Sequence, residues 1–133
     1  MKYLLVTLVL CFIACTKKEG NYNLEDLESE FGVKASISRI DNKSIFFGNV
    51  AYGEKSRNKL DIHIPDLVNP KGLLIFFHGG AFVGGDKTDI FEEYLSSIFI
   101  KIIKEGIIIV SANYSFLDSQ GSKAVLTSLE DGN

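Results

Sequence analysis

The feature that most constrains the fold of this chain is an unbroken apolar run at residues 73–77, which leads directly into a glycine-rich stretch at 78–85. A continuous apolar run of this length predicts a strand covered on both faces, as in a parallel sheet. A second such run follows at 107–110, after a helical pattern. Because a helical crossover joins parallel strands and is almost always right-handed, the sequence predicts an α/β fold.

The helix between these strands is predicted over residues 89–105. Asp89 and Glu92 have the spacing of a capping box, and Gly106 supplies a stop at the other end. One face of this helix is apolar and consists of Ile90, Phe91, Tyr94, Leu95, Ile98, Phe99, Ile102 and Ile103. Two earlier strands are predicted at 44–52 and 60–64, and a second helix is predicted to begin within 122–131.

The first apolar strand is followed by four glycines: Gly79, Gly80, Gly84 and Gly85. At the carboxyl end of a strand in an α/β sheet, glycines let the backbone approach a ligand or adopt a positive φ. A phosphate-binding loop is one interpretation, because Lys87 and Thr88 come next. Its spacing fails, since Asp86 precedes the lysine and would place a carboxylate where phosphate charge must be received. A turn that binds no ligand is a further alternative.

Several motifs occur in a specific order: Tyr52-Gly53, then Leu-Asp-Ile-His-Ile-Pro at 60–65, His-Gly-Gly-Ala-Phe-Val-Gly-Gly-Asp-Lys at 78–87 and Val-Ser-Ala-Asn-Tyr at 110–114. Over residues 49–131 this succession resembles the HGGG-type esterase/lipase branch of the α/β-hydrolase fold, which includes hormone-sensitive-lipase-like carboxylesterases. There are two departures. Ala81 replaces the third glycine, and Ser-Phe-Leu-Asp at 115–118 stands where relatives carry arginine, leucine and an Ala-Pro-Glu run.

The resemblance implies that residues 37–133 are the N-terminal half of an α/β-hydrolase domain. This half would hold about four strands of an incomplete sheet, one complete crossover helix and the start of a second. The backbone N–H groups of Gly79, Gly80 and Ala81 would then form an oxyanion hole, which stabilises the negative oxygen formed when an acyl carbonyl is attacked. His78 would brace this loop rather than act as the general base.

The nucleophile, the acid and the histidine base of such an enzyme are not expected within this chain. No G-x-S-x-G motif occurs, and neither Ser111, Ser115 nor Ser122 lies between the required glycines. The alternation in the strand at 60–64 places His63 on the polar face and predicts a surface residue, while Asp131 is expected to be structural.

The expected function is therefore that of a truncated serine hydrolase, which in the complete parent protein acts on small carboxylic esters without cofactor or metal. The 133-residue chain alone is expected to be inactive and poorly soluble, because the strand at 73–77 would form a bare sheet edge. The alternative is a non-catalytic lipoprotein that uses this half-domain to bind a partner. The sequence leaves the oligomeric state open.

The N-terminal residues predict export. Lys2 and the apolar run that follows are typical of a signal peptide at 1–14, and an apolar run of this length is too short to span a bilayer. The segment Phe-Ile-Ala-Cys at 12–15 resembles a bacterial lipobox, which implies a lipidated Cys15 and attachment to a bacterial membrane or cell envelope. Residues 15–36 are predicted to be a tether, in which Leu24, Leu27 and Phe31 could form a short amphipathic turn. Plain secretion is the alternative.

Two properties of the composition exclude other classes of protein. The only cysteines are Cys11 and Cys15, so cleavage of the signal peptide leaves no pair for an internal disulfide or a cysteine metal site. The formal net charge is −3, and no basic cluster occurs beyond Lys17-Lys18. Nucleic acid is therefore not an expected partner.

Overall fold

The structure, a computed structural model, describes residues 23–65 and 69–117. The predicted signal peptide, Cys15, the second helix and Asp131 lie outside these described residues. Within the described ranges, no helix is both long enough and apolar enough to span a membrane.

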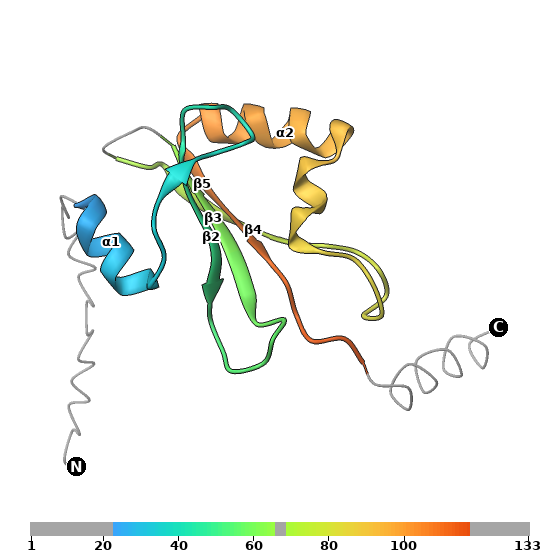
Figure 1. Ribbon diagram of the computed structural model, residues 1–133. Coiled ribbons are helices and arrows are strands. Elements are labelled where there is room, and N and C mark those ends of the chain that lie inside the picture. Colours follow the sequence, from blue (N-terminus) through green and yellow to red (C-terminus); the bar gives the residue numbers. More distant parts are fainter. Residues whose placement is uncertain (1–22, 66–68, 118–133) are drawn as a thin grey trace, which may run out of the picture.

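The chain forms one mixed sheet with the strand order β1-β2-β3-β5-β4 (Figure 1). The strands are β1 (Ser36–Ile37), β2 (Ile45–Ala51), β3 (Lys59–Ile64), β4 (Gly72–Phe77) and β5 (Ile107–Ala112). β4 and β5 pair in parallel, and the other neighbouring strands pair antiparallel. The predicted α/β class and the four predicted strands are confirmed, and the short β1 is an addition that the sequence analysis did not include.

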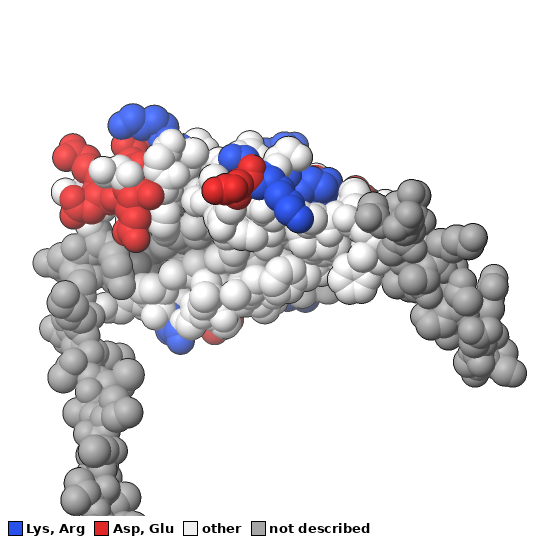
Figure 2. All heavy atoms as spheres, turned by 90° about the horizontal axis from the view of Figure 1, so that it is seen from below, with Lys and Arg blue, Asp and Glu red and all other residues white. Residues whose placement is uncertain are grey.

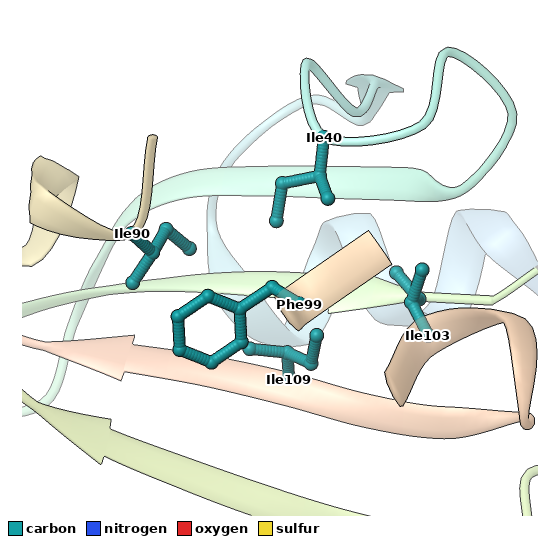
Figure 3. Close-up of a cluster of buried hydrophobic side chains, with 5 residues drawn as sticks. All are labelled: Ile40, Ile90, Phe99, Ile103 and Ile109. Carbon is teal, nitrogen blue, oxygen red and sulfur yellow. The ribbon is translucent and has the colours of Figure 1, made fainter. Parts of the chain in front are cut away.

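Helices cover the two faces of this sheet, so the molecule has three layers (Figure 1). On one face, Ile90, Phe99 and Ile103 pack with Ile109 of β5 and with Ile40 (Figure 3). The opposite face is formed around Phe47, Val50 and Ile62, with side chains of α1 (Leu24–Phe31) packed against them. Successive residues of a strand point to opposite faces, so β5 contributes Ile109 to the first cluster and its neighbours Ile108 and Val110 to the second.

The predicted helix over 89–105 is divided into two helices. A 3₁₀-helix, η1 (Lys87–Phe91), precedes α2 (Glu93–Lys104), and Glu92 between them has the extended ψ of 141°. The capping box also begins three residues earlier than predicted, because the side chain of Asp86 accepts from the backbone of Thr88 while Asp89 reaches back to the Asp86 N–H. The predicted stop at Gly106 is confirmed by its φ of 84°.

The folded part of the chain begins earlier than residue 37. Asn23 caps α1, and Gly32, with a φ of 66°, ends it, although these residues fall in the predicted tether. The helix packs on β2, where the rings of Phe31 and Phe47 meet edge to face at 5.0 Å. Its outer surface is acidic, and Figure 2 shows the carboxylates gathered at this end of the molecule.

β4 is the edge strand of the sheet among the described residues. Leu74 and Phe76 pack under α2, which covers one face of the strand. The prediction that both faces are covered is not met within the described residues, because Leu73, Ile75 and Phe77 on the other face are 59%, 52% and 62% exposed. An apolar strand with a free hydrogen-bonding edge favours pairing with a further strand.

The prediction that His63 is a surface residue is wrong. Its side chain is fully buried between the rings of Phe46 and Phe91, and its Nδ1 lies 2.8 Å from the hydroxyl of Ser38. Alternation in β3 does place the polar side chains on one face of the strand. That face is buried, however, because Ser38 from the segment between β1 and β2 and Phe91 of η1 cover it. Burial lowers the pKa of His63 to about 4, outweighing the attraction of Asp61 and Asp41, and the positive charge of Lys87 acts in the same direction as burial.

Acid should destabilise this fold through His63. In the unfolded chain His63 has an ordinary pKa of about 6.5, whereas in the folded chain it is protonated only at about pH 4. The free energy of unfolding should therefore keep its full value above pH 6.5 and should fall by about 3 kcal/mol as the pH drops to about 4. Urea unfolding followed by circular dichroism across this range measures the loss. His63→Gln should remove this component, and an unchanged pH dependence in that variant would contradict the assignment.

Candidate functional site

The glycine-rich loop lies at the carboxyl ends of two parallel strands. Phe77 of β4 pairs with Ala112 of β5, so the residues that follow each strand emerge side by side. Three consecutive residues of the loop have positive φ: Gly80 at 109°, Ala81 at 50° and Phe82 at 62°. A side chain at Gly80 would place its Cβ 2.2 Å from the carbonyl oxygen of Gly84, so the tight turn requires glycine there.

The N–H groups predicted to form the oxyanion hole have no acceptor among the described residues. Gly79, Gly80 and Ala81 are exposed, and none of their N–H groups donates to a backbone or side-chain acceptor in the ranges 23–65 and 69–117. The carbonyl groups that share a peptide unit with these N–H groups, those of residues 78, 79 and 80, all accept hydrogen bonds. Tyr114 Oη donates to the carbonyls of His78 and Gly79 at 2.9 and 3.3 Å, and the Gly80 carbonyl accepts from the N–H groups of Val83 and Gly84.

These carbonyl bonds fix the direction of the N–H groups. In a planar trans peptide the C=O of one residue and the N–H of the next point in opposite directions. Because the carbonyls of residues 78, 79 and 80 are held by the protein, the N–H groups of residues 79, 80 and 81 point away from those bonds. The arrangement leaves a row of donors at the end of the sheet.

His78 is held on all sides. Its ring is stacked on Tyr114 at 4.4 Å, Nδ1 lies 2.7 Å from the Gly79 carbonyl, and Nε2 lies 3.3 Å from Nη2 of Arg57. A carbonyl oxygen only accepts and a guanidinium only donates, so these partners specify the neutral ring with its proton on Nδ1. With both nitrogens engaged and the side chain buried, His78 has the geometry of a brace and not of a free base.

The far end of the loop is anchored by a buried ion pair. Lys87 Nζ donates to Asp61 Oδ2 at 2.8 Å, and the two side chains are 8% and 3% exposed. The backbone of Lys87 is held as well, because its N–H donates to Asn113 Oδ1 and its carbonyl accepts from the Ser111 hydroxyl. This geometry rules against the phosphate-loop alternative, since the lysine points into the sheet and not toward the loop.

The carboxylate of Asp86 is also held by hydrogen bonds, which it accepts from Thr88 and Asn113. Burial raises the pKa of Asp86, but hydrogen bonds from Asn113 and Thr88 outweigh it, with help from the charge of Lys87, and the net effect lowers the pKa. Asn113 Nδ2 donates to Asp86 Oδ2 at 2.8 Å. The carboxylate is thereby held as the cap of η1 and does not face the exposed amides.

The structure brings one serine and one histidine together that the sequence analysis did not connect. Ser38 is 1% exposed and His63 is fully buried, so no substrate reaches this pair. The Ser38 hydroxyl also accepts from the Ile40 N–H at 3.1 Å, which identifies a structural contact. In the described ranges, no group of three or more His, Cys, Asp or Glu side chains is arranged to hold a metal ion.

Sequence reasoning missed the residues that hold the loop: Arg57, Asp61, Lys87, Asn113 and Tyr114. Two of them carried a usable signal. Asp61 interrupts an apolar strand of a sheet that helices cover on both faces, and Lys87 follows the loop directly, so a buried pair between them was open to prediction. Arg57 lies in a polar turn before β3, where nothing in the residue pattern distinguishes it from a solvent-exposed arginine.

Comparisons with known proteins give little beyond this geometry. No protein-family model matches the chain, and no curated protein sequence matches it. Among solved structures, the chain is similar to the crystal structure of a protein from Silicibacter sp. TM1040, described as a "putative thioesterase", with 23% identity and a TM-score of 0.46. The match covers 81% of this chain and 38% of that protein, so the chain spans well under half of its length.

The loop conformation should depend on Gly80 and tolerate change at Gly79. Gly80→Ala introduces a Cβ into a residue with a φ of 109° and against the Gly84 carbonyl, and should destabilise the fold by about 1–3 kcal/mol. Gly79→Ala is the matched control, because a Cβ there meets nothing within 4 Å, and it should change stability by less than about 0.5 kcal/mol. Urea unfolding measures both, and equal effects of the two changes would refute the described turn.

Proposed function

We propose that this chain supplies the oxyanion half of a serine hydrolase that acts on carboxylic esters. The observation that carries the proposal is the row of exposed N–H groups at Gly79, Gly80 and Ala81, which have no acceptor among the described residues. They lie at the carboxyl end of β4, the edge of an α/β sheet where ligands commonly bind. The nucleophile, acid and histidine base would come from polypeptide beyond residue 133.

The chemistry that such a loop provides is electrostatic. Attack on an ester carbonyl converts its oxygen into an oxyanion, and donors already aimed at that position need no rearrangement at the moment of reaction. One donor of this kind typically contributes about 2.7–4 kcal/mol to the stability of the transition state. The loop suits this task because its carbonyls are bonded inward, so no acceptor oxygen of residues 78–80 competes for the same space.

Among the described residues β4 pairs with β5 on one side and with no strand on the other, and this open edge supports the same proposal. The family that the sequence resembles places the strand carrying the nucleophile beside this strand. A partner strand there would cover Leu73, Ile75 and Phe77, whose exposure is otherwise unfavourable. If this partner strand runs parallel to β4, the residue that follows it would lie next to the glycine-rich loop, because parallel neighbours end at the same edge of a sheet.

The proposed location is the cell envelope of a bacterium. A signal peptide at 1–14 and a lipidated Cys15 would attach the folded part to a membrane by way of the residues before α1. The observation that supports this location is the lipobox-like segment at 12–15, and plain secretion is the alternative.

The coding sequence after residue 133 gives the most direct test of the hydrolase proposal. One reading frame should encode a strand followed by G-x-S-x-G. The protein translated through that frame should hydrolyse p-nitrophenyl butyrate and react with a fluorophosphonate, whereas the 133-residue chain should do neither. In the longer protein, Gly80→Ala keeps the backbone N–H, but its Cβ would collide with the Gly84 carbonyl and so displace the turn. Misplacing an oxyanion donor in this way should lower kcat by about 10²–10³-fold, the typical effect of losing one such donor.

Two results would contradict the proposal. The first is the absence of such a motif in all three frames, which would favour the non-catalytic binding module. The second is full esterase activity in the Gly80→Ala protein, which would show that the transition state does not depend on the conformation of this loop. Gly84→Ala controls for a general effect of substitution in the loop, because Gly84 is not one of the proposed donors and its Cβ would meet no other atom within 4 Å.

A further inference from the structure

We infer that Arg57 is a positioning residue for the oxyanion loop, acting through His78, an inference that rests on the proposed function. Arg57 belongs to the turn between β2 and β3 and lies far from the loop in sequence. Its guanidinium nevertheless contacts both ends of the loop, because Nη2 lies 3.3 Å from His78 Nε2 and donates to the Gly85 carbonyl at 2.9 Å. Its guanidinium therefore bridges the two ends of the loop.

The guanidinium is itself fixed in orientation. Nε donates to the Tyr114 carbonyl at 3.0 Å, the plane lies over the ring of Phe116 at 3.8 Å, and Nη1 is 3.8 Å from Asp86 Oδ2. The planar fork of arginine meets these partners at once, which the single ammonium of a lysine cannot do. Arg57 is partly buried, with 28% of its side chain exposed, so these contacts are not fully screened by solvent.

Arg57 affects the loop by fixing which ring nitrogen of His78 carries the proton. By donating to His78 Nε2, Arg57 requires that nitrogen to be unprotonated, and so keeps the ring proton on Nδ1. The Nδ1–H then bonds the Gly79 carbonyl, alongside Tyr114. Because the Gly79 carbonyl and the Gly80 N–H belong to one planar peptide, holding the carbonyl inward holds the N–H outward. Arg57 thus sets the direction of an oxyanion donor that it does not touch.

Nitrogen-15 NMR of the full chain in detergent micelles, with labelled histidine and glycine, tests this inference. The parent should show His78 as the neutral Nδ1–H form. Arg57→Met keeps an apolar stem over Phe116 but has no donors, so Nε2–H signals of His78 should appear and the Gly80 amide resonance should shift. Arg57→Lys keeps the charge and a single donor group but not the fork, and should show smaller changes of the same kind in both signals.

Arg39→Met is the matched control, because Arg39 also lies over an aromatic ring, Phe91 at 5.0 Å, but forms no hydrogen bond with residues 78–85 of the loop. It should leave the His78 and Gly80 signals unchanged. A folded Arg57→Met protein with His78 still wholly in the Nδ1–H form and an unshifted Gly80 amide would overturn the inference, and so would both signals unshifted in Arg57→Lys if the Met variant does not fold. This readout needs no catalysis, so it is independent of whether the longer protein hydrolyses esters.

Discussion

The buried ion pair between Lys87 and Asp61 is the interaction on which the arrangement of the site depends. Asp61 accepts from Lys87 through one oxygen and from the N–H of Asn49 through the other, at 2.8 Å in both cases. Asn49 lies at the irregularity in β2, with a φ of 60°. One carboxylate therefore ties together the bulge of β2, the middle of β3 and the start of η1. Removing one member of such a pair leaves an uncompensated buried charge and typically costs about 3–5 kcal/mol.

This anchor and the cluster around His78 divide the loop into fixed ends and a free middle. The backbone of Lys87 is hydrogen-bonded to Ser111 of β5 and to Asn113 just after this strand. The carbonyl of His78 accepts from the next residue, Tyr114. The end of β5 therefore holds both ends of the loop. Between them, the carbonyls of residues 78–80 are bonded within the protein, and the N–H groups of residues 79–81 have no acceptor among the described residues, which is the property that an oxyanion hole needs. Positive φ at Ala81 and Phe82 is the conformational cost of this turn.

The sequence was sufficient for the scaffold because the scaffold depends on patterns of apolar residues. The runs at 73–77 and 107–110, with a helical pattern between them, led directly to the parallel pair of β4 and β5. The division into η1 and α2 could not be read in the same way, because the apolar periodicity continues through Glu92 while the backbone does not.

The site was predictable only in part, for a different physical reason. The glycines indicated where the backbone would be exposed, but the groups that orient it are polar side chains brought together from separate turns and strands. Alternation in β3 placed Asp61 and His63 on one face, yet it does not distinguish a polar face in water from one that pairs charges under a helix. Arg57 and Tyr114 meet His78 only after the sheet has formed.

Amide hydrogen exchange, resolved by residue, tests most directly whether the loop presents free donors. The N–H groups of Gly79, Gly80 and Ala81 should exchange at the rate of an unprotected peptide, while those of Val83 and Gly84, which donate to the Gly80 carbonyl, should exchange more slowly. Protection of residues 79–81 comparable to that of the β5 strand would mean that these N–H groups are already bonded within the fold, and the site as described would not exist.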